Sequence, residues 1–391
     1  STPPPSTSTR RLRPAPERAP EGSVIVEAVE LRRLSLPLVT PFRTAAGTHA
    51  GKDVLLVRVL GPDGEGWGEC GALEEPTYTS EYVAGAELVL RLHLVPRLLA
   101  APGVSAGRLA VALAPVKGHR MAKAALEMAL LDAELRAAGR SLATALGGVR
   151  DSVDAGVAVG IHPSIAELVG AVEGYVAAGY RRVKLKIEPG WDVEPLAAVR
   201  AAVGPEVGLM ADANGSYSAP TAADLCRVDD LGLLCLEQPL HPRDLAGHAA
   251  LARRMRTPIC LDESVESAAD AAEALDMGAC AVVNIKAARC GGYLEAVRVH
   301  DACVARGAPV WCGGMLETGL GRAANVALAA LPGFTMPGDL SASDRWFAED
   351  LTEPFVLRDG RLAVPTGPGL GVTPLPDVLR ARTTTCEVVR R

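Results

Sequence analysis

The chain has 391 residues, 49% of them hydrophobic, which is enough for two or three ordinary domains or for one large barrel with an added domain. Its formal net charge of −6 argues against nucleic-acid binding, and the lack of an apolar run of about 18 residues argues against a membrane-spanning helix. Nine cysteines stand singly and no apolar leader is visible, so we expect a cytoplasmic protein.

The N-terminal third predicts a tail followed by a small α+β domain. Residues 1–22, rich in Pro, Ser, Thr and Arg, are expected to be disordered, and residues 23–150 to form the domain. The stretch Pro37–Gly51 predicts a long connection that could close as a lid over a site, with His49 as a surface residue. The predicted strands are Val24–Leu34, Val54–Leu60 and Glu65–Ala72, and the predicted helices are Glu81–Leu99 and Met121–Ala138.

From residue 151 to residue 350, short apolar segments alternate with amphipathic helices such as Ile165–Ala178. This alternation is typical of parallel strands joined by helical crossovers, and it predicts an α/β fold of the (β/α)₈ type, a modified TIM barrel. Residues 351–391 are expected to return to the first domain and complete it as a cap. The predicted barrel strands are Val153–Ile161, Arg182–Ile187, Leu209–Asn214, Leu233–Gln238, Ile259–Glu263, Ala281–Lys286, Pro309–Gly313 and, more weakly, Phe334–Pro337.

Ionisable residues recur at the carboxyl ends of five successive predicted strands. Lys186, Asp212, Glu237, Asp262 and Lys286 are separated by 26, 25, 25 and 24 residues, which is one β/α unit each time. The carboxyl ends of the strands form the active-site face of such barrels. Because an unpaired charge is costly to bury, we expect these side chains to pair with one another or to bind a metal ion.

The three acids Asp212, Glu237 and Asp262 would repel one another without a cation. A set of carboxylate oxygens suits a hard divalent ion, most simply Mg²⁺, with Mn²⁺ or Co²⁺ as possible substitutes. Each acid taken alone could be a solvated or helix-capping residue. Their shared position at the strand ends favours a common site.

Lysine is scarce in this chain. Arginine fills most of the 40 cationic positions, and only six are lysines: Lys52, Lys117, Lys123, Lys184, Lys186 and Lys286. Three of the six lie at the predicted strand ends, where we expect neighbouring cations to lower the lysine pKa values. A lysine can then act as a base, whereas an arginine cannot give up its proton. Alternatively, these lysines only neutralise the acids as structural ion pairs.

Acids and lysines together imply removal of a proton α to a carboxylate, with a metal ion stabilising the enediolate. Two other interpretations stay open. A Schiff-base aldolase could use Lys286 but has no need of three carboxylates. A non-catalytic barrel would show no metal dependence and no loss of activity after the change Lys186→Ala.

The segments around these residues resemble the enolase superfamily, muconate-lactonizing subgroup. Those segments are Lys184-Leu-Lys186, Asp212-Ala-Asn214, Glu237-Gln-Pro239, Asp262-Glu-Ser264 and Asn284-Ile-Lys286. Further segments look like its o-succinylbenzoate synthase and N-succinylamino acid racemase branch, namely Gly66-Trp-Gly-Glu-Cys70, Gly118-His-Arg-Met121, Trp311-Cys-Gly-Gly-Met-Leu-Glu-Thr318 and Pro337-Gly-Asp-Leu-Ser-Ala-Ser-Asp344. The resemblance extends from about Val24 to Leu379.

The resemblance implies roles for individual residues. Asp212, Glu237 and Asp262 would bind the metal, and Lys186 and Lys286 would be the paired acid and base. In the racemases one lysine removes the α-proton and the other reprotonates the opposite face, whereas in the synthases the Lys186 position carries a syn dehydration. Substrate contact or support would come from Lys184, Asn214, Arg289, Gly314, Met315 and Glu317, with Glu263 behind the metal site.

Several of these assignments have alternatives. Glu317 could be a solvated loop acid, and strand alternation would turn Glu263 away into a structural ion pair. Ala158 and the Ala-Ala-Arg-Cys that follows Lys286 depart from the branch and bear on the acyl-group preference. The family also implies a small carboxylate substrate and self-association into a homo-oligomer.

Related reactions fit the sequence less well. No histidine lies on the predicted seventh strand, which argues against the mandelate racemase branch, and Gly338-Asp-Leu-Ser lacks the Asp-x-Asp of dipeptide epimerases. The segment Gly319-Leu-Gly-Arg-Ala-Ala324 matches a dinucleotide-binding pattern but has no acidic residue about 20 positions on. We expect its glycines to let the loop approach the substrate instead.

Overall fold

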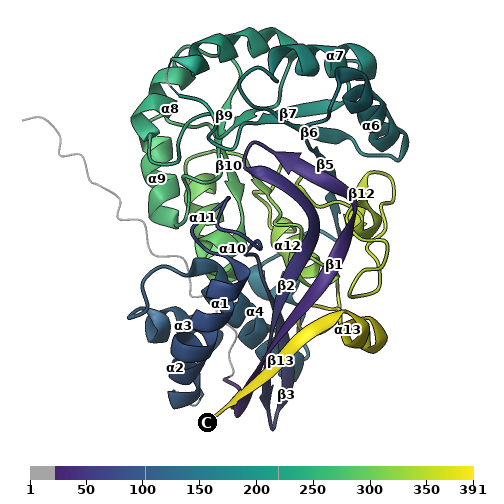
Figure 1. The fold of residues 1–391 in the computed structure, drawn as a ribbon. Coiled ribbons are helices and arrows are strands. Elements are labelled where there is room, and N and C mark those ends of the chain that lie inside the picture. Colours follow the sequence, from purple (N-terminus) through teal and green to yellow (C-terminus); the bar gives the residue numbers. More distant parts are fainter. Residues whose placement is uncertain (1–22, 102, 219) are drawn as a thin grey trace, which may run out of the picture.

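The computed structural model describes residues 23–101, 103–218 and 220–391. They form a capping domain with an antiparallel sheet and a barrel domain with a curled parallel sheet surrounded by helices (Figure 1). The predicted fold class is therefore confirmed, while the exact domain limits stay a prediction. The predicted disordered tail, residues 1–22, lies outside the described residues.

Both ends of the described chain contribute to the capping sheet. Its strand order is β13-β1-β2-β3, and β13 runs antiparallel along β1, with Ala28 opposite Arg390 (Figure 1). The C-terminal segment thus returns to the capping domain, as expected. The strands are β1 (Ala28–Thr44), β2 (Gly47–Gly61), β3 (Gly64–Cys70) and β13 (Thr383–Arg390).

The predicted long connection Pro37–Gly51 is wrong, because β1 and β2 continue through most of it as a hairpin. The pairing breaks between Pro37 and Phe42, where prolines cannot donate to the ladder, and resumes with Phe42 opposite His49. The hairpin reaches the barrel, where the Ile161 N–H donates to the carbonyl oxygen of Arg43 at 2.9 Å. A paired hairpin therefore occupies the place predicted for a lid loop.

The helices of the capping domain pack around α4. This helix corresponds to the predicted Met121–Ala138 and is buried on nearly every side. The predicted helix Glu81–Leu99 is a continuous helical run whose middle, η1, is a π-helical segment. The helices are α1 (Val83–Val89), η1 (Leu90–Leu94), α2 (Val95–Ala100), α3 (Ala106–Leu113), α4 (Arg120–Ala137) and α5 (Leu142–Leu146), of which α3 and α5 were not predicted.

The barrel sheet has seven parallel strands in the order β11-β10-β9-β8-β7-β6-β5. The strands are β5 (Gly156–Val159), β6 (Arg182–Lys186), β7 (Gly208–Asp212), β8 (Leu236–Glu237), β9 (Ile259–Leu261), β10 (Val282–Ile285) and β11 (Val310–Cys312). The helices between and after them are α6 (Ile165–Ala177), α7 (Val193–Val203), the 3₁₀ helix η2 (Thr221–Leu231), α8 (Leu245–Ala252), α9 (Ala268–Asp276), α10 (Ala287–Cys290), α11 (Tyr293–Val304) and α12 (Gly319–Ala329).

Two strand predictions need correction. The predicted first strand is split, since β4 (Ser152–Asp154) pairs with β12 (Arg361–Ala363) before β5 begins. The predicted eighth strand, Phe334–Pro337, forms no ladder: Phe334 makes an isolated bridge with Val310, and Gly338, directly after the segment, makes one with Ala155. Proline has no N–H for the ladder, and the Pro337 carbonyl accepts hydrogen bonds from the Arg182 guanidinium at 2.7 and 3.1 Å. The last elements are η3 (Ser343–Arg345) and α13 (Pro376–Arg382).

The barrel interior is filled by side chains below the strand ends. Its apolar cluster consists of Met210, Cys235, Cys260, Val282 and Trp311. All nine cysteines are free, and most are buried as small apolar side chains. Within the described part of the chain, no helix is long and apolar enough to cross a membrane.

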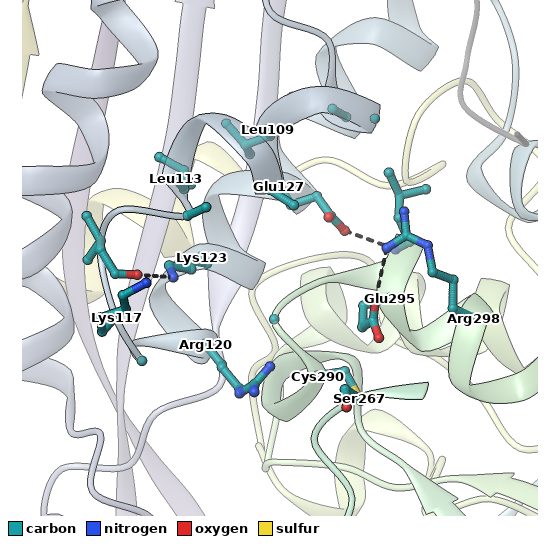
Figure 2. Close-up of a pocket in the computed structure, with 18 residues that line it drawn as sticks. Leu109, Leu113, Lys117, Arg120, Lys123, Glu127, Ser267, Cys290, Glu295 and Arg298 are labelled. Carbon is teal, nitrogen blue, oxygen red and sulfur yellow. Dashed lines mark hydrogen bonds and ion pairs between the residues drawn. The ribbon is translucent and has the colours of Figure 1, made fainter. Parts of the chain in front are cut away.

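A cavity of about 410 Å³ lies at the seam between the domains, where α3 and α4 face α10 and α11 (Figure 2). Most of its charged side chains already have partners: Arg298 pairs with Glu295, Arg120 pairs with Glu266, and Lys123 donates to a backbone carbonyl. The predicted site residues line a different cavity, at the mouth of the barrel.

Candidate active site

Neighbouring strands bring the predicted lysine and acids into one row. In the parallel ladder Lys186 lies opposite Asp212, and Asp212 lies opposite Glu237, each at the last position of its strand. Asp262 and Lys286 follow directly after β9 and β10. All five side chains are buried, so the 25-residue repeat does place five ionisable groups together.

Each ammonium group lies against carboxylates. The Lys186 Nζ is 2.6 Å from Asp212 Oδ2, and the Lys286 Nζ is 2.6 Å from Asp262 Oδ2. Lys184 is fully buried, with its Nζ 2.7 Å from Glu237 Oε2 and 2.6 Å from Asp339 Oδ2. The lysines therefore flank the three consecutive acids at the mouth of the barrel and pair with them.

This pairing reverses the expected direction of the lysine pKa shifts. Burial by itself lowers the pKa of Lys286, but the carboxylates of Asp262 and Glu263 outweigh burial and raise it above its ordinary value. Burial also opposes the charge on Lys184, yet the neighbouring acids raise its pKa in the same way. In this arrangement the acids favour the protonated forms of Lys184 and Lys286, in contrast to the expected lowering.

Glu237 occupies the centre of the acidic row. Burial raises its pKa well above the ordinary value, and the nearby charges of Asp212 and Asp262 raise it further. Asp212 has a lowered pKa, because Lys186 and Lys184 outweigh its burial. The positive charge is thus shared unevenly, since Asp212 pairs with two lysines whereas Glu237 pairs only with Lys184.

The donor set fits a hard divalent cation. As the side chains lie, no three His, Cys, Asp or Glu groups among the described residues surround a common metal position, because the acids face the lysines instead. Asp262 Oδ1 and Glu263 Oε2 are nevertheless buried without a hydrogen-bond partner. Carboxylate oxygens of this kind are the ligands that Mg²⁺ prefers.

A small cavity opens between the two predicted catalytic lysines. Its volume is about 70 Å³, and Lys186, Lys286, Asn214, Gly314 and Met315 are among its lining residues. Three other predicted substrate residues, Lys184, Arg289 and Glu317, do not line it. The predicted set therefore divides into residues on the cavity wall and residues that support it.

The supporting residues have definite partners. Arg289 lies with its Nε 3.2 Å from Asp262 Oδ1 and donates to the Val265 carbonyl at 2.7 Å. Glu317 turns back toward α12, where its Oε1 accepts from Asn325 at 2.9 Å. Both residues hold loops of the site in place.

Glu263 is on the site side, contrary to the expected strand alternation. Strand β9 ends at Leu261, so a two-residue period does not apply to Glu263. Its Oε1 accepts a hydrogen bond from Asn214 Nδ2 at 3.0 Å, and Asn214 Oδ1 accepts from Lys186 at 2.9 Å. Burial raises the pKa of Glu263 to about 7.

Two residues that contact the predicted site lysines escaped the sequence analysis. Tyr78, from the capping domain, accepts a hydrogen bond from Lys286 Nζ at 2.7 Å, and its hydroxyl lies 3.0 Å from Asp262 Oδ2. Asp339 follows the irregular eighth segment and pairs with Lys184 and Arg182, each at 2.6 Å. The position of Asp339 just after the eighth segment was a usable signal, whereas nothing in the local sequence marked Tyr78.

The β1–β2 hairpin closes one side of the cavity. Phe42 and His49, paired in the hairpin, both line it together with Leu73 and Tyr78. His49 is half-buried rather than an ordinary surface residue, and burial lowers its pKa. Capping-domain residues therefore form the wall opposite the barrel strands.

Gly313 leaves space for the side chain of Lys286, which extends to the cavity. A Cβ atom at Gly313 would lie 2.7 Å from the Lys286 Cε, which is closer than real Cβ contacts allow. The side chain of Lys286 passes over this position between β10 and β11. The glycine-rich loop thus serves lysine placement at this point.

Comparison with known proteins gives the same protein class, the enolase superfamily, that the arrangement of the site residues suggests. Residues 28–147 match the model of the mandelate racemase / muconate lactonizing enzyme N-terminal domain, and residues 167–378 match the enolase C-terminal domain-like model. The chain belongs to the enolase superfamily. Members of this superfamily are divalent-metal-dependent enzymes.

Relatives with assigned activities narrow the group. The chain is 60% identical to an N-succinylamino acid racemase from Amycolatopsis sp over 359 residues, which cover 92% of this chain and 98% of that protein. It is 46% identical to an o-succinylbenzoate synthase from Geobacillus stearothermophilus, over 89% of this chain and 93% of that protein. A solved enolase-superfamily structure from Listeria innocua superposes with a TM-score of 0.90 at 38% identity, covering 94% and 99% of the two chains.

Proposed function

We propose that this chain is an Mg²⁺-dependent N-succinylamino acid racemase, acting on N-acylamino acids, that also catalyses the syn dehydration of an o-succinylbenzoate synthase. One observation carries the proposal: Lys186 and Lys286 line one cavity, and the strands between theirs contribute Asp212, Glu237 and Asp262. Two ammonium groups on either side of an acidic row suit removal of an α-proton and its return to the other face. The similarity to the Amycolatopsis racemase supports the same activity.

The protein groups act on a substrate held with its α-carbon between the lysines. In one direction the neutral Lys186 amine takes the α-proton, the C–H electron pair passes into the carboxylate as an enediolate, and the Lys286 ammonium group returns a proton to the opposite face. In the other direction the two lysines exchange roles. Racemisation is complete without any external oxidant or reductant.

Asp212, Glu237 and Asp262 would hold the divalent ion. It would neutralise these acids, stabilise the charge that develops on the substrate carboxylate and remove the interactions that raise the pKa values of Lys184 and Lys286. Mg²⁺ is the natural choice for carboxylate oxygens, with Mn²⁺ or Co²⁺ as substitutes. Asn214 and Glu263 would support this set, since Asn214 bonds both Lys186 and Glu263.

The other predicted residues would act around this centre. Lys184 would keep the carboxylates of Glu237 and Asp339 in place near Lys186 through its ion pairs with both. Arg289 would tune Lys286 through Asp262, which it contacts at 3.2 Å. Gly314 and Met315 would contact the substrate, and Glu317 would support them through Asn325.

The dehydration uses the same arrangement. Lys186 would take the α-proton and then return a proton to the departing hydroxyl on the same face, so that water leaves and a carbon–carbon double bond forms. Lys286 would stay protonated and stabilise the enediolate. A dedicated o-succinylbenzoate synthase is the second candidate, favoured by the similarity to the Geobacillus synthase.

Proton exchange in D₂O tests the proposal directly. The protein is incubated with N-succinyl-L-phenylalanine and Mg²⁺ in D₂O, and the α-proton signal and optical rotation are followed together. Loss of both signals is expected, whereas no exchange across several N-acyl groups would overturn the racemase assignment. o-Succinylbenzoate formation is assayed in parallel. A protein that forms o-succinylbenzoate but exchanges no α-proton of an N-acylamino acid would be a dedicated synthase. Borohydride trapping of a lysine adduct would reveal an aldolase.

Two further expectations accompany the proposal. A cytoplasmic location agrees with nine free cysteines, all among the described residues. Self-association into a homo-oligomer stays a prediction, which sedimentation or mass photometry can measure.

A further inference from the structure

The loop between β11 and α12, residues 313–318, forms the part of the cavity wall that lies beside Lys286. Gly314, Met315 and Leu316 all line the cavity. Leu316 has a φ angle of +59°, in the left-handed region that leucine rarely adopts. Such a conformation is unfavourable for leucine and persists only where surrounding contacts hold it.

The first of these contacts comes from a buried lysine in the capping domain. Lys52, on β2, is 2% exposed, and its Nζ donates to the Met315 carbonyl at 2.8 Å and to the Ala72 carbonyl at 3.2 Å. Among the described residues Lys52 forms no ion pair, although the charge of its ammonium group acts on the nearby carboxylate of Glu69. A buried cation that bonds two backbone carbonyls therefore joins the capping domain to the loop, directly before the strained residue.

The second contact comes from a buried acid on the next strand. Glu69, on β3, accepts hydrogen bonds from the Thr318 N–H at 3.0 Å, the Thr318 hydroxyl at 2.7 Å and the Gly321 N–H at 2.9 Å. These are donors at the start of α12, where N–H groups have no partner within the helix. Glu69 thus fastens the end of the loop just as Lys52 fastens its middle.

We propose that Lys52 and Glu69 are positioning residues that hold the β11–α12 loop and thereby set the preference of the site among N-acyl groups. The two anchors enclose Leu316 and Glu317, and both belong to strands of the capping domain rather than to the barrel. Neither side chain lines the substrate cavity, so each acts through the loop. The part of the proposal that concerns substrates rests on the proposed function, whereas the part that concerns the loop does not.

The test compares Lys52→Met with Lys117→Met, since Lys117 is an exposed lysine of the same domain that lies outside the site. Hydrogen–deuterium exchange of the peptide covering residues 313–318 reports on the loop. Kinetics with N-succinyl- and N-acetyl-phenylalanine report on preference. We expect the loop of Lys52→Met to exchange about tenfold faster, KM for the N-succinyl substrate to rise about tenfold, and kcat to stay within about twofold, because one hydrogen bond to the loop is lost while the acid–base lysines are untouched.

Lys117→Met should match the wild-type protein in both measurements. A folded Lys52→Met variant with unchanged loop exchange, or with an unchanged ratio of kcat/KM for the two substrates, overturns the proposal, even where its melting temperature is lower. Should Lys52→Met fail to fold, Glu69→Gln is measured in the same way and decides by the same criteria. A wild-type protein that turns over no N-acylamino acid refutes the proposed function, and loop exchange then still tests the positioning role.

Discussion

The strand-end row and the wall opposite it are built in different ways. Lys186, Asp212 and Glu237 lie side by side because each ends a strand of a regular parallel ladder. The opposite wall combines Tyr78, the tip of the β1–β2 hairpin and the β11–α12 loop, which come from distant parts of the chain. A repeated unit thus supplies the groups suited to chemistry, whereas contacts between domains shape the space around the substrate.

Removal of the divalent ion should affect the strand-end row most strongly. Incubation with a chelator, followed by gel filtration, is expected to reduce α-proton exchange to the uncatalysed rate, because the three acids would then again bind the lysines. Mg²⁺ added afterwards should restore activity. Full activity of a protein that metal analysis shows to be free of divalent ions would mean that the acidic row does not act by binding a metal ion.

Loss of Lys186 or Lys286 should have the second largest effect on activity. Lys186→Ala and Lys286→Ala are each expected to lower kcat by about 10²–10⁴-fold, the usual contribution of a positioned acid or base. Circular dichroism would confirm that the variants are folded, and Lys123→Ala, in the cavity at the domain seam, serves as the matched control. A near-normal kcat in both variants would mean that the lysines only neutralise the acids as structural ion pairs.

Tyr78 joins the two regions, and its removal should have an intermediate effect. The change Tyr78→Phe keeps the ring that lies 4.7 Å from Lys286 Nζ but removes the hydroxyl that contacts Lys286 and Asp262. We expect kcat/KM to fall about tenfold, because a hydrogen bond to a charged group is lost. An unchanged kcat/KM for both enantiomers would show that the hydroxyl does not position Lys286.

The smallest expected effect concerns stability at the seam between the domains. Burial raises the pKa of Glu127 to about 7, from an ordinary value of 4.5. Between these values the folded protein keeps a proton that the unfolded chain has released, so the free energy of unfolding falls as pH rises from about 5 to about 8. Gln has no proton to lose in this range. Between about pH 5 and pH 8, the free energy of unfolding of Glu127→Gln should therefore fall by about 1–3 kcal/mol less than that of the wild-type protein.

Denaturant titrations at the two pH values measure this difference. The exposed residue Glu173, on α6, provides the control change Glu173→Gln, which should follow the wild-type curve. Equal pH dependence of the wild-type protein and Glu127→Gln would mean that Glu127 is already ionised in the folded state.

Periodic features were readable from the chain alone. The spacing of Lys186, Asp212, Glu237, Asp262 and Lys286 follows the β/α unit, so each residue's place at a strand end depends on its own unit. The same is true of α4 and of the strands β6 to β11, whose apolar patterns are local. Scarcity of lysine then singled out three positions where a cation able to lose its proton is useful.

Only the tertiary structure decided which distant residues meet. The eighth segment lacks a ladder because Arg182 bonds the Pro337 carbonyl, a contact across 155 positions of the chain. Tyr78 reaches Lys286 across 208 positions, and Lys52 reaches Met315 across 263, and neither approach leaves a pattern in the local sequence. The pKa values of Lys184 and Lys286 likewise depend on neighbours from other strands. Local periodicity therefore determined the strand-end row, and packing between the domains determined the wall that faces it.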